Sequence, residues 1–147
     1  MYKLKSYVIL LLIGFFSFGA MYYVTAKKKI EVPRNITKDK SENFTSLEIE
    51  RFRQLLSSKK GVLIDVRTSI ELESGKINGA KNINFYGSDF DQQINSLNKN
   101  QTFFLYGSIG SRSKKVMLLM SELEFTEVYS LKNGIRGWKT DGYRIKK

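Results

Sequence analysis

Apolar and polar residues alternate along residues 44–147 in a pattern that predicts strands and helices in turn. Residues 62–66 form a nearly continuous apolar run, which is typical of a buried parallel strand. In all, four strands are expected, over residues 62–66, 80–84, 102–106 and 127–131. Helices are expected over residues 90–97 and 113–123, the second with an apolar stripe that would face a sheet. The alternation predicts an α/β fold with a mainly parallel central sheet flanked by helices.

Two pairs of residues have the spacing of a helix capping box, in which two side chains satisfy each other's backbone N–H groups. Thr45 and Glu48 would begin a helix whose apolar face holds Ile49, Phe52, Leu55 and Leu56. Thr68 and Glu71 would begin a short helix that ends near Gly75. After the last strand, residues 134–142 read as a glycine-punctuated tail around Trp138, which we interpret as a structural aromatic residue.

The N-terminal segment has a different character, because residues 6–26 contain no charged side chain. As a helix, this segment would span about 30 Å, the thickness of the hydrocarbon core of a bilayer. Tyr22 and Tyr23 followed by three lysines are typical of a membrane interface. We therefore predict one transmembrane anchor within residues 1–26. A cleaved signal peptide is the alternative, but its apolar region is usually only about 7 to 15 residues long.

Residues 27–43 are polar and contain the only proline, Pro33, so we predict a basic linker there and a domain over residues 44–147. Lys and Arg are more abundant after the anchor than before it, which favours a cytoplasmic domain. A short N-terminal tail that stays inside would instead send the domain out. The expected location is a single-pass membrane protein facing the cytoplasm, with the opposite topology left open.

Composition removes several classes of function. The chain has no cysteine and no histidine, so it lacks thiol nucleophiles, disulfides, the commonest general base and the commonest metal ligands. We expect no metal and no cofactor. The net charge of +11 would suit nucleic acid, but residues 1–43 alone carry 8 basic against 3 acidic residues. Because that excess lies beside the anchor, we do not expect a nucleic-acid partner.

The strongest candidate site is the segment Gly107-Ser108-Ile109-Gly110-Ser111-Arg112, between an expected strand and an expected helix. Unpaired N–H groups at a helix N-terminus bind anions, and Arg112 adds a fork of donors. The segment predicts a pocket for thiosulfate, phosphate, sulfate or a carboxylate of a partner. The alternative is a capping turn in which Arg112 bonds neighbouring carbonyl groups. Ser108, Ser111 and Ser113 have no histidine to activate them, so serine catalysis is not expected.

Several separated motifs closely resemble the rhodanese-like family of sulfurtransferases. They are Asp65-Val66-Arg67, Glu71, Gly75-Lys76-Ile77-Asn78-Gly79-Ala80, the segment 107–112, and Asn133-Gly134-Ile135 with Trp138. The resemblance implies a three-layer fold in which Asp65 and Arg67 support the loops of the site. It also implies that a catalytic cysteine, the carrier of a persulfide, would occupy the position of Gly107. Related phosphatases use a loop one residue longer, so that reading fits less well.

Two departures from the family pattern are Lys76 in place of its usual histidine and Asn78 in place of proline. Both changes keep the turn plausible, because asparagine is an accepted turn residue. Gly107 in the position of the cysteine, together with the expected anchor, implies a membrane-anchored rhodanese-like domain that has lost sulfur transfer and binds an anion or a protein. One alternative is a sulfurtransferase that depends on the thiol of a partner chain. Another is a protein held at the membrane surface by its basic linker.

Overall fold

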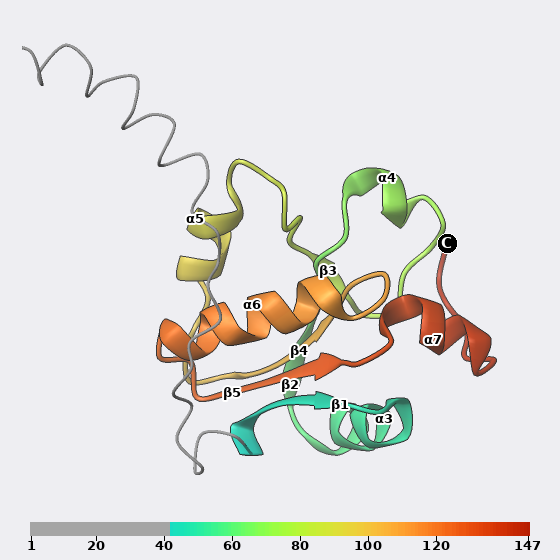
Figure 1. The fold of residues 1–147 in the computed structure, drawn as a ribbon, viewed down its shortest axis with the longest axis horizontal. Helices are drawn as coiled ribbons and strands as arrows, with labels where there is room; N and C mark the ends of the chain where they lie inside the picture. Colours follow the sequence, from blue (N-terminus) through green and yellow to red (C-terminus); the bar gives the residue numbers. More distant parts are fainter. Residues whose placement is uncertain (1–41) are drawn as a thin grey trace, which may run out of the picture. The chain divides into compact units, whose positions relative to one another are not determined.

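A computed structural model describes residues 42–147, and the chain there alternates between strands and helices as the sequence predicts (Figure 1). The expected anchor and nearly all of the linker lie outside the described residues. Within residues 42–147, no helix has the length and apolar character needed to cross a bilayer.

A sheet of five strands forms the centre of the domain, and all pairings between its strands are parallel. Its spatial order is β1-β5-β4-β2-β3. The strands are β1 (Phe44–Leu47), β2 (Gly61–Asp65), β3 (Lys81–Asn82), β4 (Thr102–Tyr106) and β5 (Glu127–Leu131). Asp65 lies opposite Tyr106, and Leu105 opposite Ser130, so the carboxyl ends of the three central strands meet at one edge. In an open parallel sheet, this is the edge where ligands usually bind.

Helices cover both faces of the sheet and give it the expected three layers. They are α3 (Ile49–Ser58), α4 (Ser69–Leu72), α5 (Phe90–Asn95), α6 (Ser111–Glu122) and α7 (Gly134–Thr140). Apolar residues of α5 and α6 pack in one core cluster with Phe103, and those of α3 and α7 pack in another with Phe104. Because successive side chains of a strand point to opposite faces, β4 supplies both cores. The predicted α/β fold with a parallel sheet is confirmed.

The expected capping box at Thr45 and Glu48 is wrong, because Phe44–Leu47 forms strand β1 at the edge of the sheet. The helix begins after Glu48, whose side chain makes no capping hydrogen bond. Buried Phe44 anchors this strand in the core, and its backbone pairs with β5. A four-residue edge strand has too short a pattern to be recognised without its distant partner.

The remaining predicted elements agree with the structure in part. The capping box at Thr68 and Glu71 is present as predicted. The strand expected over residues 80–84 is regular only at Lys81–Asn82, although the Ile83 N–H still donates to the Asp65 carbonyl at 3.0 Å. The glycine-punctuated tail contains helix α7, so the glycines there do not prevent a helix.

Candidate functional site

The candidate segment, hereafter the glycine loop (residues 107–112), leaves the carboxyl end of β4 and enters α6. Figure 1 shows it beside α4 and close to the start of α7. Gly107 and Gly110 are buried, whereas Ile109 and Ser111 are exposed. The loop is therefore rooted in the core and open to solvent at its tip.

The loop is held by its carbonyl groups, which leaves its N–H groups available. Ile135 and Arg136, in the first turn of α7, donate their N–H groups to the carbonyls of Gly107 and Ser108 at 2.9 and 3.1 Å. Because the N–H and C=O of one peptide point in opposite directions, the following N–H groups point away from α7. Within residues 42–147, no acceptor is found for the backbone N–H groups of residues 108–113. Those of residues 111–113 lie in the first turn of α6, and free N–H groups at a helix N-terminus favour an anion.

The glycines around the loop divide into two kinds. Gly110 has φ +89°, and a Cβ there would lie 1.8 Å from the Lys132 carbonyl oxygen. Gly134 has φ +57°, and its Cβ would lie 2.4 Å from the Gly107 carbonyl oxygen. Both positions therefore require glycine. At Gly107 the nearest atom to a Cβ would be 3.5 Å away, at ordinary contact distance, so the fold does not require glycine there.

Arg112 does not bond neighbouring carbonyls, and it does not point its charge freely into the loop. Its guanidinium forms a two-bond pair with the carboxylate of Glu71 on α4, with Nη1 2.7 Å from Oε2. Nη2 also donates to Ser108 Oγ at 2.9 Å, and the Ser108 hydroxyl donates to Glu71. Sequence reasoning identified Glu71 as a capping residue and missed this second role, because no local pattern links residues so far apart.

The same carboxylate caps α4, because Thr68 donates its N–H and its hydroxyl to Glu71 Oε2 at 3.0 Å each. The hydrogen bonds from Arg112, and next those from Ser108 and Thr68, outweigh burial and hold the pKa of Glu71 well below its usual range. The Glu71 partner likewise raises the pKa of Arg112. Glu71 and Arg112 therefore carry opposite charges that largely cancel, and the net positive character of the loop comes from its N–H groups.

Asp65 and Arg67 form a buried ion pair at the end of β2, with Arg67 Nη2 2.7 Å from Asp65 Oδ2. Arg67 also donates to the backbone carbonyls of Glu71 and Gly75, at 2.9 and 2.8 Å. The pair thus fastens α4, and with it the carboxylate that faces Arg112, to the central sheet. Neither side chain reaches the glycine loop itself in any hydrogen bond found among residues 42–147.

The remaining candidates have structural contacts. Trp138 packs in the second core cluster and donates its indole N–H to the Arg144 carbonyl at 3.0 Å. Lys76 donates to the Ala80 carbonyl at 3.1 Å and stays outside the loop. In the described part of the chain, no group of three acidic side chains is placed to hold a metal ion.

Comparison with known proteins gives consistent matches. The sequence model of the Rhodanese-like domain matches residues 48–141. The Bacillus subtilis protein YqhL is 34% identical over 93 residues, which are 63% of this chain and 71% of YqhL. A tRNA uridine(34) hydroxylase of Wolbachia is 29% identical over 126 residues, which are 80% of this chain and 47% of the hydroxylase, so the chain spans about half of that protein's length.

Two solved structures extend the comparison to the fold. A rhodanese-like domain protein of Staphylococcus aureus has a TM-score of 0.59 at 28% identity, covering 70% of this chain and 99% of the other. A rhodanese-related protein of Thermoplasma volcanium has a TM-score of 0.61 at 22% identity, covering 69% and 96%.

Proposed function

This chain belongs to the rhodanese-like domain family, and we propose that it is a membrane-anchored binding module that holds an anion on its glycine loop and transfers no sulfur. The observation that carries the proposal is the combination of unpaired N–H groups at residues 108–113 with a chain that contains no cysteine. The unpaired N–H groups can still bind an anion. The absence of cysteine removes the thiolate that would react with it.

The serines of the loop do not replace the thiol. Among residues 42–147, the carboxylate that accepts a hydrogen bond from the Ser108 hydroxyl is that of Glu71, but its lowered pKa makes it a weak base. The Ser113 hydroxyl is buried and donates to the Gly110 carbonyl at 3.1 Å. Without an adjacent base, a serine hydroxyl is a poor nucleophile. Binding therefore fits the site better than covalent chemistry.

Membrane attachment belongs to the same proposal and rests on the sequence. The uncharged segment 6–26 and the lysines that follow it have the length and charge of a single-pass anchor. Such an anchor would keep the glycine loop near the bilayer, on the cytoplasmic side if the bias of basic residues decides the topology.

The anion site is tested by isothermal titration calorimetry of the full-length chain in neutral detergent, with thiosulfate and with phosphate as the titrants. We expect saturable binding at millimolar concentration. Glu71→Gln should raise the anion affinity several-fold, because it leaves the positive charge of Arg112 uncompensated. Arg112→Ala should lower the anion affinity by a similar factor, because it leaves the negative charge of Glu71 unpaired beside the loop.

Glu127→Gln, at the opposite end of the sheet, is the matched control and should leave anion affinity unchanged. Absence of saturable binding at millimolar anion, or equal binding by the Arg112→Ala variant, would exclude the pocket.

Sulfur transfer with a thiol from a partner chain is the second candidate. Its support is the position of Gly107, where the missing side chain leaves ordinary contact space beside the loop. Thiosulfate-to-cyanide transfer by the unaltered chain, seen only when a thiol-bearing protein is added, would favour this candidate over pure binding.

A further inference from the structure

The exposed apolar side chains of the described domain lie on the glycine loop or on segments that contact it. In residues 42–147, the large apolar side chains classed as exposed are Ile70, Tyr86 and Ile109, at 78%, 68% and 52%. Ile70 precedes Glu71 on α4, and Ile109 lies within the loop. The ring of Tyr86 lies 5.6 Å from the guanidinium carbon of Arg112. Single exposed apolar residues are ordinary, but these three, the apolar rim, all lie on segments joined by the Glu71–Arg112 network, which favours an interaction surface.

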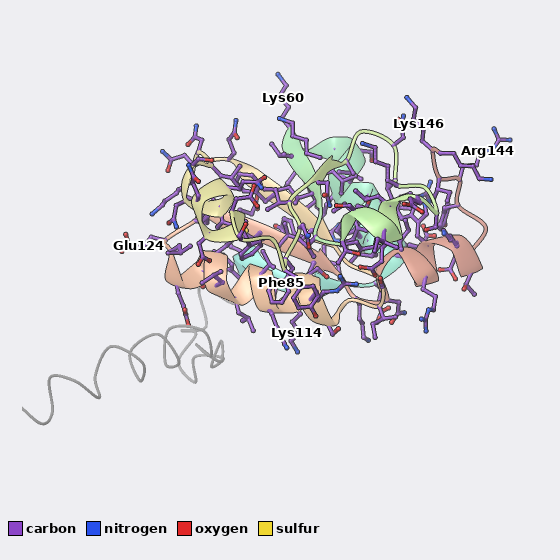
Figure 2. All side chains as sticks on the ribbon, turned by 90° about the horizontal axis from the view of Figure 1, so that it is seen from above. Lys60, Phe85, Lys114, Glu124, Arg144 and Lys146 are labelled. Carbon is purple, nitrogen blue, oxygen red and sulfur yellow. The ribbon has the colours of Figure 1, made fainter. Side chains whose placement is uncertain are left out.

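Basic side chains flank the same loop. Lys114 and Lys115 lie in the first turns of α6, and the Lys114 N–H donates to the Gly110 carbonyl at 3.0 Å. Arg136 is tied to the loop through its own N–H, which donates to the Ser108 carbonyl at 3.1 Å. All three side chains are exposed, and none forms an ion pair with another described residue. Figure 2 shows Lys114 projecting outward from α6.

Building on the proposed function, we propose that the anion held by the glycine loop is a carboxylate side chain of a partner protein, presented on an extended segment between apolar residues. The apolar rim would contact the flanking side chains, and the basic flank of Lys114, Lys115 and Arg136 would attract the acidic segment. A free inorganic anion would use only the N–H groups and would leave the rim exposed to water. Charge complementarity and exposed apolar surface together thus favour a protein segment.

The local charges favour a carboxylate over a phosphorylated side chain. A phosphoryl group carries nearly two charges and is usually met by an unpaired arginine. Here the arginine within the loop, Arg112, is already neutralised by Glu71. Arg136 is bonded to the loop through its backbone N–H, and no hydrogen bond found in residues 42–147 brings its guanidinium to the loop. The N-terminus of α6 contributes the equivalent of about half a positive charge, which suits a single negative charge.

Three capped synthetic peptides test the inference on the full-length chain in neutral detergent. The first, Ser-Leu-Glu-Leu-Ser, has both a carboxylate and flanking apolar side chains. The second has glutamine in place of glutamate, and the third has serine in place of both leucines. Thiosulfate and soluble short-chain phosphatidylglycerol are titrated beside them. We expect the first peptide to bind at least about tenfold more tightly than the other two, because each lacks one of the two contacts.

Two sets of variants locate the binding. Ile70→Ser combined with Tyr86→Ser should weaken the first peptide about tenfold and leave thiosulfate affinity unchanged, since neither side chain contacts a loop N–H group. Lys114→Glu should weaken the peptide more than Lys99→Glu, which makes the same charge change at the opposite end of β4.

The outcomes separate the two proposals. If thiosulfate binds but the three peptides bind equally or not at all, the protein-partner inference is overturned and the anion site stands. If neither thiosulfate nor any peptide binds, both fail. Binding of phosphatidylglycerol in preference to the peptides, weakened by the Ile70→Ser and Tyr86→Ser changes, would assign the surface to the membrane and overturn the inference.

Discussion

Glu127 and Glu71 lie at opposite ends of the sheet, and each accepts several hydrogen bonds. At the amino end, Glu127 accepts from Lys59, from Thr102 at 2.5 Å and from Tyr129 at 2.7 Å. At the carboxyl end, Glu71 is equally well satisfied by Arg112, Ser108 and Thr68. The difference is that the carboxyl end also holds backbone N–H groups for which residues 42–147 provide no acceptor.

This difference separates a stabilising network from a candidate binding site. A network in which every charge is satisfied rigidifies the fold and offers nothing to a ligand. Unpaired donors at a helix N-terminus remain available, and the satisfied Glu71 network beside them keeps the loop in place. Glutamate therefore has a structural role at both ends of the sheet. The unpaired backbone N–H groups of the glycine loop are what make the carboxyl end a candidate site.

The largest effect that would sharpen the comparison is a gain of activity in Gly107→Cys. A Cβ fits at this position, and the unpaired N–H groups and the helix dipole would lower the pKa of the new thiol. We expect thiosulfate-to-cyanide sulfur transfer at least about a hundredfold above that of the unaltered chain, measured as thiocyanate release.

Lys99→Cys is the control, because it places an exposed thiol at the opposite end of β4, away from the loop. It should remain as inactive as the parent. A folded Gly107→Cys variant without activity would show that the loop no longer supports sulfur chemistry, and equal activity in the two variants would show that any thiol suffices.

The next effect concerns stability and compares glycines of the same loop. Gly110→Ala places a Cβ within 1.8 Å of a backbone oxygen at positive φ, so we expect a loss of roughly 3 kcal/mol or more in the free energy of unfolding. Gly107→Ala should change it by less than about 1 kcal/mol, because the added methyl group makes ordinary contacts. Urea unfolding followed by the fluorescence of Trp138, the single tryptophan, measures both. Similar losses in the two variants would contradict the distinction.

The sequence predicts those features whose signal is local. Strands β4 and β5 have the expected bounds, because their residues are mostly buried and their apolar character is read directly. The glycine loop is also found locally, from a strand, two glycines and a helix. Strand β1 is missed because it forms by pairing with β5, which lies far along the chain. The pair of Glu71 and Arg112 depends in the same way on the packing of α4 against the loop, which no spacing within either segment encodes.

The smallest effect is the dependence of stability on pH, which tests whether the two glutamate networks contribute alike. The folded-state pKa of each carboxyl group lies below its ordinary value of 4.5. At Glu71 the hydrogen bonds from Arg112 are the main cause. At Glu127 burial would raise the pKa, but the hydrogen bonds from Lys59, Thr102 and Tyr129 outweigh it. A carboxyl group whose pKa is lower in the folded state stabilises the fold fully when the pH is above its pKa in the unfolded state. This contribution is lost as the pH falls through the pKa of the folded state. Stability should therefore be level near neutral pH and decline below about pH 4.5.

Glu71→Gln and Glu127→Gln should each cost about 1 to 2 kcal/mol at pH 7 and should each make the decline in acid shallower. Glu73→Gln, which removes a charge that forms no ion pair with another described residue, is the control and should change neither quantity. The measurement is the urea midpoint between pH 3 and pH 7. If only one of the two variants makes the urea midpoint less dependent on pH, the two glutamate networks do not contribute equally to stability. The two ends of the sheet would then differ in their carboxylates as well as in their unpaired N–H groups.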